Sequence, residues 1–149
     1  AARPAPASGA VTVRVRRTSP TAKLPTKSHA EDAGWDLYSD DIWRITAGHT
    51  QTVVIGIGME IPEGYVGLIC GRSGYAVRGI DVYAGVVDSS FRGEVGVILH
   101  NAGEIPIHIR RGDRIAQLII LKTPEVNWVE VDELLPSARG DRGFGSTGR

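Results

Sequence analysis

The sequence predicts an all-β fold, a sandwich or barrel of many short strands with at most one short helix. Short apolar segments recur about every eight to twelve residues, with turn-forming residues between them. The chain holds 19 glycines and 8 prolines, which punctuate it throughout. No long segment keeps the 3.6-residue period of an amphipathic helix. Together these observations favour a fold built from strands and tight turns.

The first strand is expected at residues 11–17, where Val11, Val13 and Val15 alternate with polar residues. A proline-bounded loop follows, to about Asp32. Further strands are expected where apolar runs lie between turns, at residues 35–38, 42–45, 51–58, 65–70, 83–87, 94–100, 105–109, 115–121 and 128–131. The one helical candidate covers residues 73–78 and would be one or two turns long.

Three regions are expected along the 149 residues. A Pro- and Ala-rich arm over residues 1–10 reads as disordered. Residues 11–135 form one β domain, because a chain of this length favours a single domain with a real core. Residues 136–149 are expected to be a flexible tail, because they are too rich in glycine to hold a helix or strand alone.

The composition narrows the classes of function. Lys+Arg and Asp+Glu both number 17, and this zero net charge argues against non-specific nucleic-acid binding while permitting a local anion site. No apolar run approaches the roughly 20 residues of a membrane span, and the first residues lack the apolar core of a secretory signal. The four histidines lack metal-ligand spacing, and the lone Cys70 is expected to be a buried small hydrophobe. We therefore expect an intracellular protein of the cytoplasm or nucleus, with neither membrane nor nucleic acid as partner.

Two segments in the first half of the chain carry polar residues with two readings each. Asp36, in Ala33–Tyr38, is either a turn-facing residue at a strand edge or an acid that orients a cation or an Arg near a site. Arg72 and Ser73 lie between glycines ahead of the possible helix. They read either as a phosphate site or as a Ser N-cap with a surface Arg. The Gly-Lys-Ser/Thr ending of a Walker A loop is missing.

Residues 85–98 predict a β-hairpin with an Asp-Ser-Ser turn. Asp88 would leave the end of a buried strand, either as a general base that takes a proton from water or as an Asx-turn residue. Phe91 either lines a site near Asp88 or simply packs in the core. Gln117, inside the apolar run that follows Asp113, is either hydrogen-bonded in the core or directed at a ligand.

The last eleven residues combine glycines, arginines, a Ser-Thr pair and Phe144. Glycine N–H groups, hydroxyls and Arg bind phosphate, and a Phe ring stacks on a base. The alternative is a disordered tail, in which Phe144 has no role.

These five segments, in their order, resemble the five motifs of the trimeric deoxyuridine triphosphate nucleotidohydrolase (dUTPase) family. The resemblance extends from Ala33 to Gly148, over the segments AGWDLYS, GRSG, GVVDSSFRGEVGV, RGDRIAQL and RGDRGFGSTG. It implies a jelly-roll-like barrel or sandwich and a homotrimer whose active sites lie at subunit interfaces, with the tail lent by a neighbour. It also implies hydrolysis of dUTP to dUMP and pyrophosphate with Mg²⁺ on the triphosphate. That reaction limits dUTP and supplies dUMP for thymidylate synthesis.

The resemblance also implies residue roles. Asp88 matches the general base that activates water for attack on the α-phosphorus, and Asp36 matches an acid that orders the site and touches the metal through water. Phosphate contacts are implied for Arg72, Ser73, Gly74, Gln117 and Arg139. The segment whose backbone reads uracil and whose ring excludes a 2′-OH is implied to be Gly85, Val86, Val87, Asp88 and Phe91. The implied lid consists of Phe144 over uracil and of Gly145, Ser146 and Thr147 over the phosphates.

Two departures and two alternatives accompany the resemblance. Phe91 stands where the family most often has Tyr, which keeps the ring and removes the hydroxyl. Gly71 stands where Pro is common. One alternative is dCTP deaminase, which resembles dUTPases in fold and releases ammonia. The other is a non-catalytic β-sandwich binding module that keeps these segments as structure.

Overall fold

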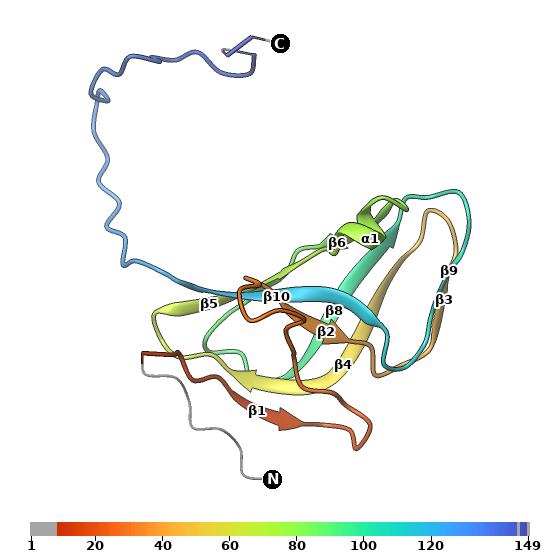
Figure 1. The fold of residues 1–149 in the computed structure, drawn as a ribbon. Helices are drawn as coiled ribbons and strands as arrows, with labels where there is room; N and C mark the ends of the chain where they lie inside the picture. Colours follow the sequence, from red (N-terminus) through yellow and green to blue (C-terminus); the bar gives the residue numbers. More distant parts are fainter. Residues whose placement is uncertain (1–8, 146, 149) are drawn as a thin grey trace.

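The computed structural model describes residues 9–145 and 147–148, and within them it contains ten short strands and one helix of four residues (Figure 1). The strands are β1 (Arg14–Arg17), β2 (Trp35–Tyr38), β3 (Trp43–Ile45), β4 (Thr50–Glu60), β5 (Tyr65–Cys70), β6 (Ile80–Tyr83), β7 (Val86–Val87), β8 (Glu94–Asn101), β9 (Ile107–Ile109) and β10 (Arg114–Lys122), and the helix is α1 (Ser73–Ala76). The all-β prediction is confirmed. None of the described helical structure is long and apolar enough to cross a membrane.

The strands form two four-stranded antiparallel sheets and one two-stranded sheet. The orders are β1-β4-β8-β6, β2-β10-β5-β7 and β3-β9. Alternation of buried and more exposed residues is clearest in β8, where Val95, Val97 and Leu99 are buried. These side chains join Leu37 and Ile115 from the other sheet in one core. Burying the apolar faces of the two sheets against each other is what a period of two in the sequence provides.

The expected hairpin over residues 85–98 is wrong in its pairing. β6 pairs with β8, whereas β7 leaves that sheet and pairs with β5 in the other. The chain changes sheet at Ala84 and Gly85, whose φ angles of 58° and 111° are both left-handed. A side chain at position 85 would place its Cβ 2.4 Å from the Ile69 carbonyl oxygen, so the crossing requires glycine. The expected strand at 83–87 is therefore two strands with a kink between them.

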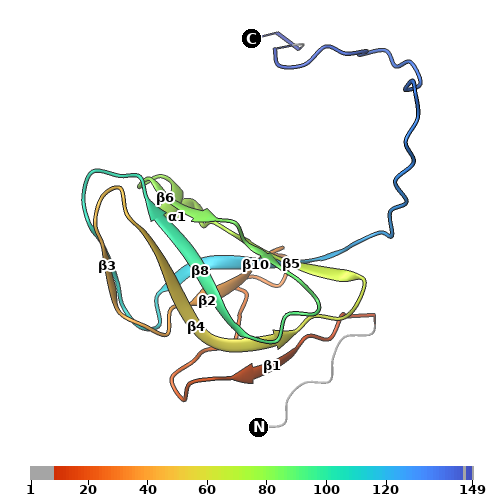
Figure 2. The same ribbon diagram turned by 180° about the vertical axis from the view of Figure 1, so that it is seen from behind.

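The strand expected at residues 128–131 does not form. The Thr123 N–H donates to the Gly64 carbonyl at 2.8 Å, and beyond it the described backbone makes hydrogen bonds only within the segment itself. Trp128 is 93% exposed. Figures 1 and 2 both show this segment leaving the body after β10. A strand needs a partner for its backbone groups, and residues 9–145 and 147–148 offer none there.

Two polar side chains fix loops around the core. The buried Asn101 amide donates to the carbonyls of Ile45 and Ile105 at 3.0 and 2.9 Å. At Asp40, burial acts to raise the carboxyl pKa, but hydrogen bonds from Ser19 and Thr21 and the charge of Arg111 together lower that pKa. Both residues tie loops that flank the strands rather than line a cavity described below.

Candidate functional site

Five of the predicted site residues line one cavity, which we call the Arg72 cavity. Its volume is about 490 Å³. The predicted residues in its wall are Asp36, Arg72, Ser73, Gly74 and Gln117. Ser28, Asp32, Ala33, Gly34 and Ile119 complete the lining and were not singled out from the sequence. The cavity therefore gathers segments that lie far apart in the chain.

Strand order explains why these residues meet. β10 lies between β2 and β5, so Gln117 is in register with Asp36 on one side and with Cys70 on the other. Arg72 follows directly after the end of β5. Cys70, expected to be buried, is half-buried at this position. The sheet thus brings together one acid, one amide and one guanidinium at its rim.

Asp36 is bound by two arginines. Its side chain is 15% exposed, and its Oδ1 lies 3.3 Å from Arg72 Nε. Its Oδ2 lies 3.9 Å from Arg114 Nη1, and Arg72 Nη1 donates to the Arg114 carbonyl at 3.2 Å. A carboxylate shared in this way fixes the position of the Arg72 side chain in the cavity wall. Arg114 was not among the predicted site residues, because its contact with Asp36 depends on the pairing of β10 with β2.

Gln117 is held in place by its neighbours. Its Nε2 donates to the Gly71 carbonyl at 2.8 Å. A Cβ at position 34 would lie 2.1 Å from Gln117 Oε1, so only glycine leaves room for this amide. Gly34 is therefore required for the shape of the cavity. The sequence did not predict this role, because a single glycine ahead of Trp35 is common at a turn. Ser28 and Asp32 come from a loop whose sequence has no period, so nothing in the sequence pointed to them.

The helix after Arg72 contributes a neutral side chain. Burial raises the pKa of Tyr75, the nearby Asp113 carboxylate raises it further, and the positive charges of Arg78 and Arg72 oppose the change. Tyr75 packs against the core. It therefore stays a neutral phenol at physiological pH and adds no negative charge beside Arg72.

The donor set of the Arg72 cavity fits an anion better than a directly bound metal. Among residues 9–145 and 147–148, no three His, Cys, Asp or Glu side chains group as metal ligands. The Asp36 carboxylate already faces two guanidinium groups. The two carboxylates in the wall, Asp32 and Asp36, fit contact through water with a cation that an anionic ligand carries.

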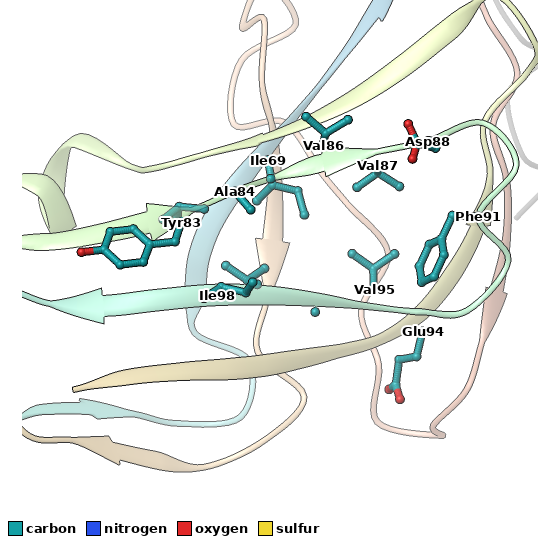
Figure 3. A pocket seen from close by; sticks show the side chains of 14 residues that line it. Ile69, Tyr83, Ala84, Val86, Val87, Asp88, Phe91, Glu94, Val95 and Ile98 are labelled. Carbon is teal, nitrogen blue, oxygen red and sulfur yellow. The ribbon is translucent and has the colours of Figure 1, made fainter.

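A second cavity, which we call the Asp88 cavity, lies between β6–β7 and β8 and has a volume of about 250 Å³ (Figure 3). Gly85, Val86, Val87, Asp88 and Phe91, all predicted site residues, line it with Ile69, Val95 and other mostly apolar neighbours. It exists because β6 and β7 join different sheets and the chain opens between them.

The side chains at the end of β7 point in different directions. Figure 3 shows Val87 directed into the Asp88 cavity and the neighbouring Asp88 carboxylate directed away from it. Asp88 is exposed, and its carbonyl accepts the Phe91 N–H at 3.1 Å. The Phe91 ring lies against Gly93, where a Cβ would come within 2.7 Å of the ring. The carboxylate is therefore presented to the surface beside an apolar hollow.

The predicted site residues fall into three separate groups in one chain. The Arg72 cavity and the Asp88 cavity share no lining residue, and the tail lines neither. Arg139 donates to the carbonyls of Arg142 and Gly143, at 2.8 and 3.3 Å, within the tail itself. Phe144 is fully exposed, Gly145 and Thr147 are exposed, and Ser146 lies outside the described residues. One chain alone does not bring these three groups together.

Comparison with known sequences gives a consistent result. The sequence profile of the family described as dUTPase matches residues 20–148. The chain is 47% identical to the deoxyuridine 5'-triphosphate nucleotidohydrolase of Corynebacterium efficiens, covering 92% of this chain and 78% of the relative. It is 43% identical to the protein of that name from Anaeromyxobacter, covering 93% and 99%. It is 42% identical to that from Variola virus, covering 91% and 92%.

Solved structures show the same likeness. A mutant dUTPase of Staphylococcus bacteriophage 80alpha with dUpNHpp superposes with a TM-score of 0.87 at 27% identity, covering 93% of this chain and 99% of the phage chain. A mutant dUTPase of S. aureus phage phi11, described as showing the coordination of a structural Mg(II) ion, superposes with a TM-score of 0.75 at 27% identity. That match covers 83% of this chain and 98% of the phage chain.

Proposed function

Because the chain belongs to the dUTPase family, we propose that it hydrolyses dUTP to dUMP and pyrophosphate. The observation that carries the proposal is the Arg72 cavity, where distant segments converge on the donors that a triphosphate requires. Relatives with this activity in their names match nearly the whole chain. The reaction would lower dUTP and provide dUMP for thymidylate synthesis.

Asp88 acts as the general base in this proposal. Its carboxylate accepts a proton from water while the water oxygen forms a bond to the α-phosphorus. The bond from the α-phosphorus to the bridging oxygen breaks, and pyrophosphate leaves with that oxygen. Its exposed position at the end of β7 supports this role, because water and substrate can reach the carboxylate.

The Arg72 cavity binds the phosphates. Arg72 supplies a guanidinium that Asp36 holds in place, Ser73 supplies a hydroxyl, and Gly74 and Gln117 complete the wall. Mg²⁺, when bound with the triphosphate, neutralises part of its negative charge. Asp36 would contact such an ion through water, because its oxygens already face Arg72 and Arg114.

The Asp88 cavity receives the nucleoside. Its wall is largely apolar. β7 is the edge strand of its sheet and pairs only with β5 among the described strands, so the other edge of the Val86–Val87 backbone is available to a base. Cytosine presents the opposite donor and acceptor pattern to uracil, so it would leave buried backbone groups unpaired. The Phe91 ring fills the space of a 2′-OH and so selects the deoxyribose.

A homotrimer unites the three groups of residues. In this proposal the Arg72 cavity of one copy faces the Asp88 cavity of a second, and the tail of a third closes over both. The division of the predicted residues within one chain supports this arrangement. The exposed apolar residues Trp128, Val129, Leu134 and Leu135 also favour a partner copy, because such side chains rarely stay in water together.

Product analysis tests the activity. The protein is incubated with Mg²⁺ and either dUTP or dCTP, and pyrophosphate and ammonia are measured. Release of pyrophosphate from dUTP but not from dCTP supports the proposal. Ammonia from dCTP would instead identify a deaminase, and tight binding of dUTP without product would identify a binding module.

Subunit mixing tests the shared site. The mass in solution should be about three times the 16.0 kDa of one chain. Two variants of strongly reduced activity, Asp88→Asn and a chain ending at Pro136, are then unfolded together and refolded. Mixed trimers should regain activity, because some sites combine an intact Asp88 with an intact tail from another copy. No gain of activity in verified mixed trimers would show that each site is built from one chain.

A further inference from the structure

The loop that carries Asp88 is held by few backbone contacts. It spans residues 88–93, between β7 in one sheet and β8 in the other. Within it, the described backbone–backbone hydrogen bond outside the strands is the one from Phe91 N–H to the Asp88 carbonyl. Strand pairing fixes the backbone only as far as Val87, so contacts within the loop also affect the position of the Asp88 carboxylate.

Arg92 binds this loop from within. Its Nη1 donates to the Ser89 carbonyl and to the Phe91 carbonyl, the latter at 3.2 Å. Its Nη2 lies 3.5 Å from Glu60 Oε1. One guanidinium thus connects two carbonyls of the loop to the end of another strand, which a planar group with five N–H donors can do.

Glu60 gives this connection a fixed anchor. It is the last residue of β4, the long strand at the centre of its sheet, and it is in register with Arg14 of β1. Glu60 Oε2 lies 3.2 Å from Arg14 Nε. The Glu60 carboxylate therefore uses one oxygen for each arginine and holds Arg92 relative to the sheet.

A hollow lies beside the loop where packed side chains would otherwise support it. Its volume is about 640 Å³, and its wall includes Ser89, Ser90, Arg92 and Glu60. The loop therefore has room to shift on this side, and the Arg92–Glu60 pair lies in the wall of the hollow. Both side chains are well exposed, 54% and 40%, so the pair adds little to folding stability.

We propose that Arg92 is a positioning residue that sets the place of the Asp88 carboxylate, and that Glu60 holds Arg92 for this purpose. The inference rests on the proposed role of Asp88 as general base. A misplacement of the base by about an ångström lowers the rate strongly even when the fold is intact. The pair consequently acts on turnover far more than on stability.

Single variants give the first test. Arg92→Ala should lower kcat by about tenfold to a hundredfold, with an unchanged melting temperature. Glu60→Gln should lower kcat less, by several fold, because the neutral amide still accepts a hydrogen bond. Arg14→Ala is the matched control, since it removes an exposed arginine from the same Glu60 without touching the loop, and its kcat should stay within about twofold. Equal kcat for Arg92→Ala and the control would overturn the proposal.

A double-mutant cycle separates positioning from a general structural effect. In an Asp88→Asn background, Arg92→Ala should cause no further loss of kcat, because the group that Arg92 positions is gone. A loss of kcat equal to that in the parent background would overturn the proposal.

Hydrogen exchange gives a readout that is independent of activity. The Phe91 amide should exchange faster in Arg92→Ala, while the β8 amides keep their rates. Unchanged Phe91 exchange would also overturn the proposal. If Asp88→Asn alone kept full activity, the proposed function of Asp88 would fail, and the exchange result would still report whether Arg92 holds the loop.

Discussion

The Arg72 cavity and the Asp88 cavity are built in opposite ways. The first lies within one sheet, where three neighbouring strands set Asp36, Gln117 and the start of the Arg72 segment in register. Ion pairs and a hydrogen bond then fix each side chain. The second lies where the chain leaves one sheet for the other. Its acid lies on a loop for which the described residues give one backbone hydrogen bond outside the strands.

Because of this difference, the two cavities should be sensitive to different kinds of substitution. Side chains held on a sheet are sensitive to steric change, because a side chain that moves to accommodate extra atoms loses the contacts that hold it. A carboxylate on a loop is sensitive to the contacts that place it, because the loop can take other positions. The tail belongs to neither case, since its described contacts lie within itself.

Removing the acid of the loop should have the largest effect. Asp88→Asn should lower kcat by about 10²–10⁴-fold, the usual contribution of a general base, while dUTP binding changes little. Pyrophosphate release gives kcat, and calorimetry with a non-hydrolysed dUTP analogue gives Kd. An unchanged kcat would show that Asp88 is not the general base. The proposal that one cavity binds phosphate and the other carries the base would then fail.

Removing the tail should come next. A chain that ends at Pro136 should lose roughly a hundredfold in kcat/KM, because a closing segment orders the substrate for attack. Its melting temperature should not change, because residues 137–148 make no described contact with the strands. Phe144→Ala should show a smaller loss of about tenfold, the value of one stacking contact. Normal turnover by the shortened chain would refute the proposed lid.

A glycine in the wall tests the rigid cavity. Gly34→Ala places a Cβ 2.1 Å from Gln117 Oε1, so the amide must rotate and lose its hydrogen bond to Gly71. We expect the KM for dUTP to rise about tenfold, the value of one hydrogen bond. Gly71→Ala is the matched control, because a Cβ there meets nothing within 4 Å. Equal effects of the two substitutions would show that the wall is not rigid.

The all-β architecture could be predicted because each strand has a recognisable local pattern in the sequence. Alternation and turn residues placed β2, β5 and β8 almost to the residue. Asp36 and Gln117 were singled out as polar residues among apolar ones, but their proximity depends on β10 lying beside β2. No local pattern encodes which strands pair, so the sequence named the members of the Arg72 cavity without its geometry.

The errors share a physical cause. The apolar run at residues 128–131 is typical of a strand, yet a strand also needs a partner, and that partner is not in the described chain. The hairpin at 85–98 failed because two left-handed residues redirected β7, and Ala84 carries no sign of a left-handed φ. Gly34 was missed because its importance lies in the Gln117 side chain that it leaves room for.

The kink at Ala84 gives the smallest expected effect and tests the origin of the Asp88 cavity. Ala84 has a φ of 58°, a conformation that costs an L-residue about 1–2 kcal/mol. A β-branched residue fits that conformation less well, so Ala84→Val should destabilise the fold by a further ~1 kcal/mol. Its melting temperature should fall by about 2–4 °C in a chain of this size. Ala84→Gly removes the clash but adds freedom to the unfolded chain, and its stability should stay within about 1 kcal/mol of the parent. If Val were tolerated as well as Gly, the kink would not be strained. The divergence of β6 and β7 would then depend on their separate pairing with β8 and β5 and not on the left-handed turn between them.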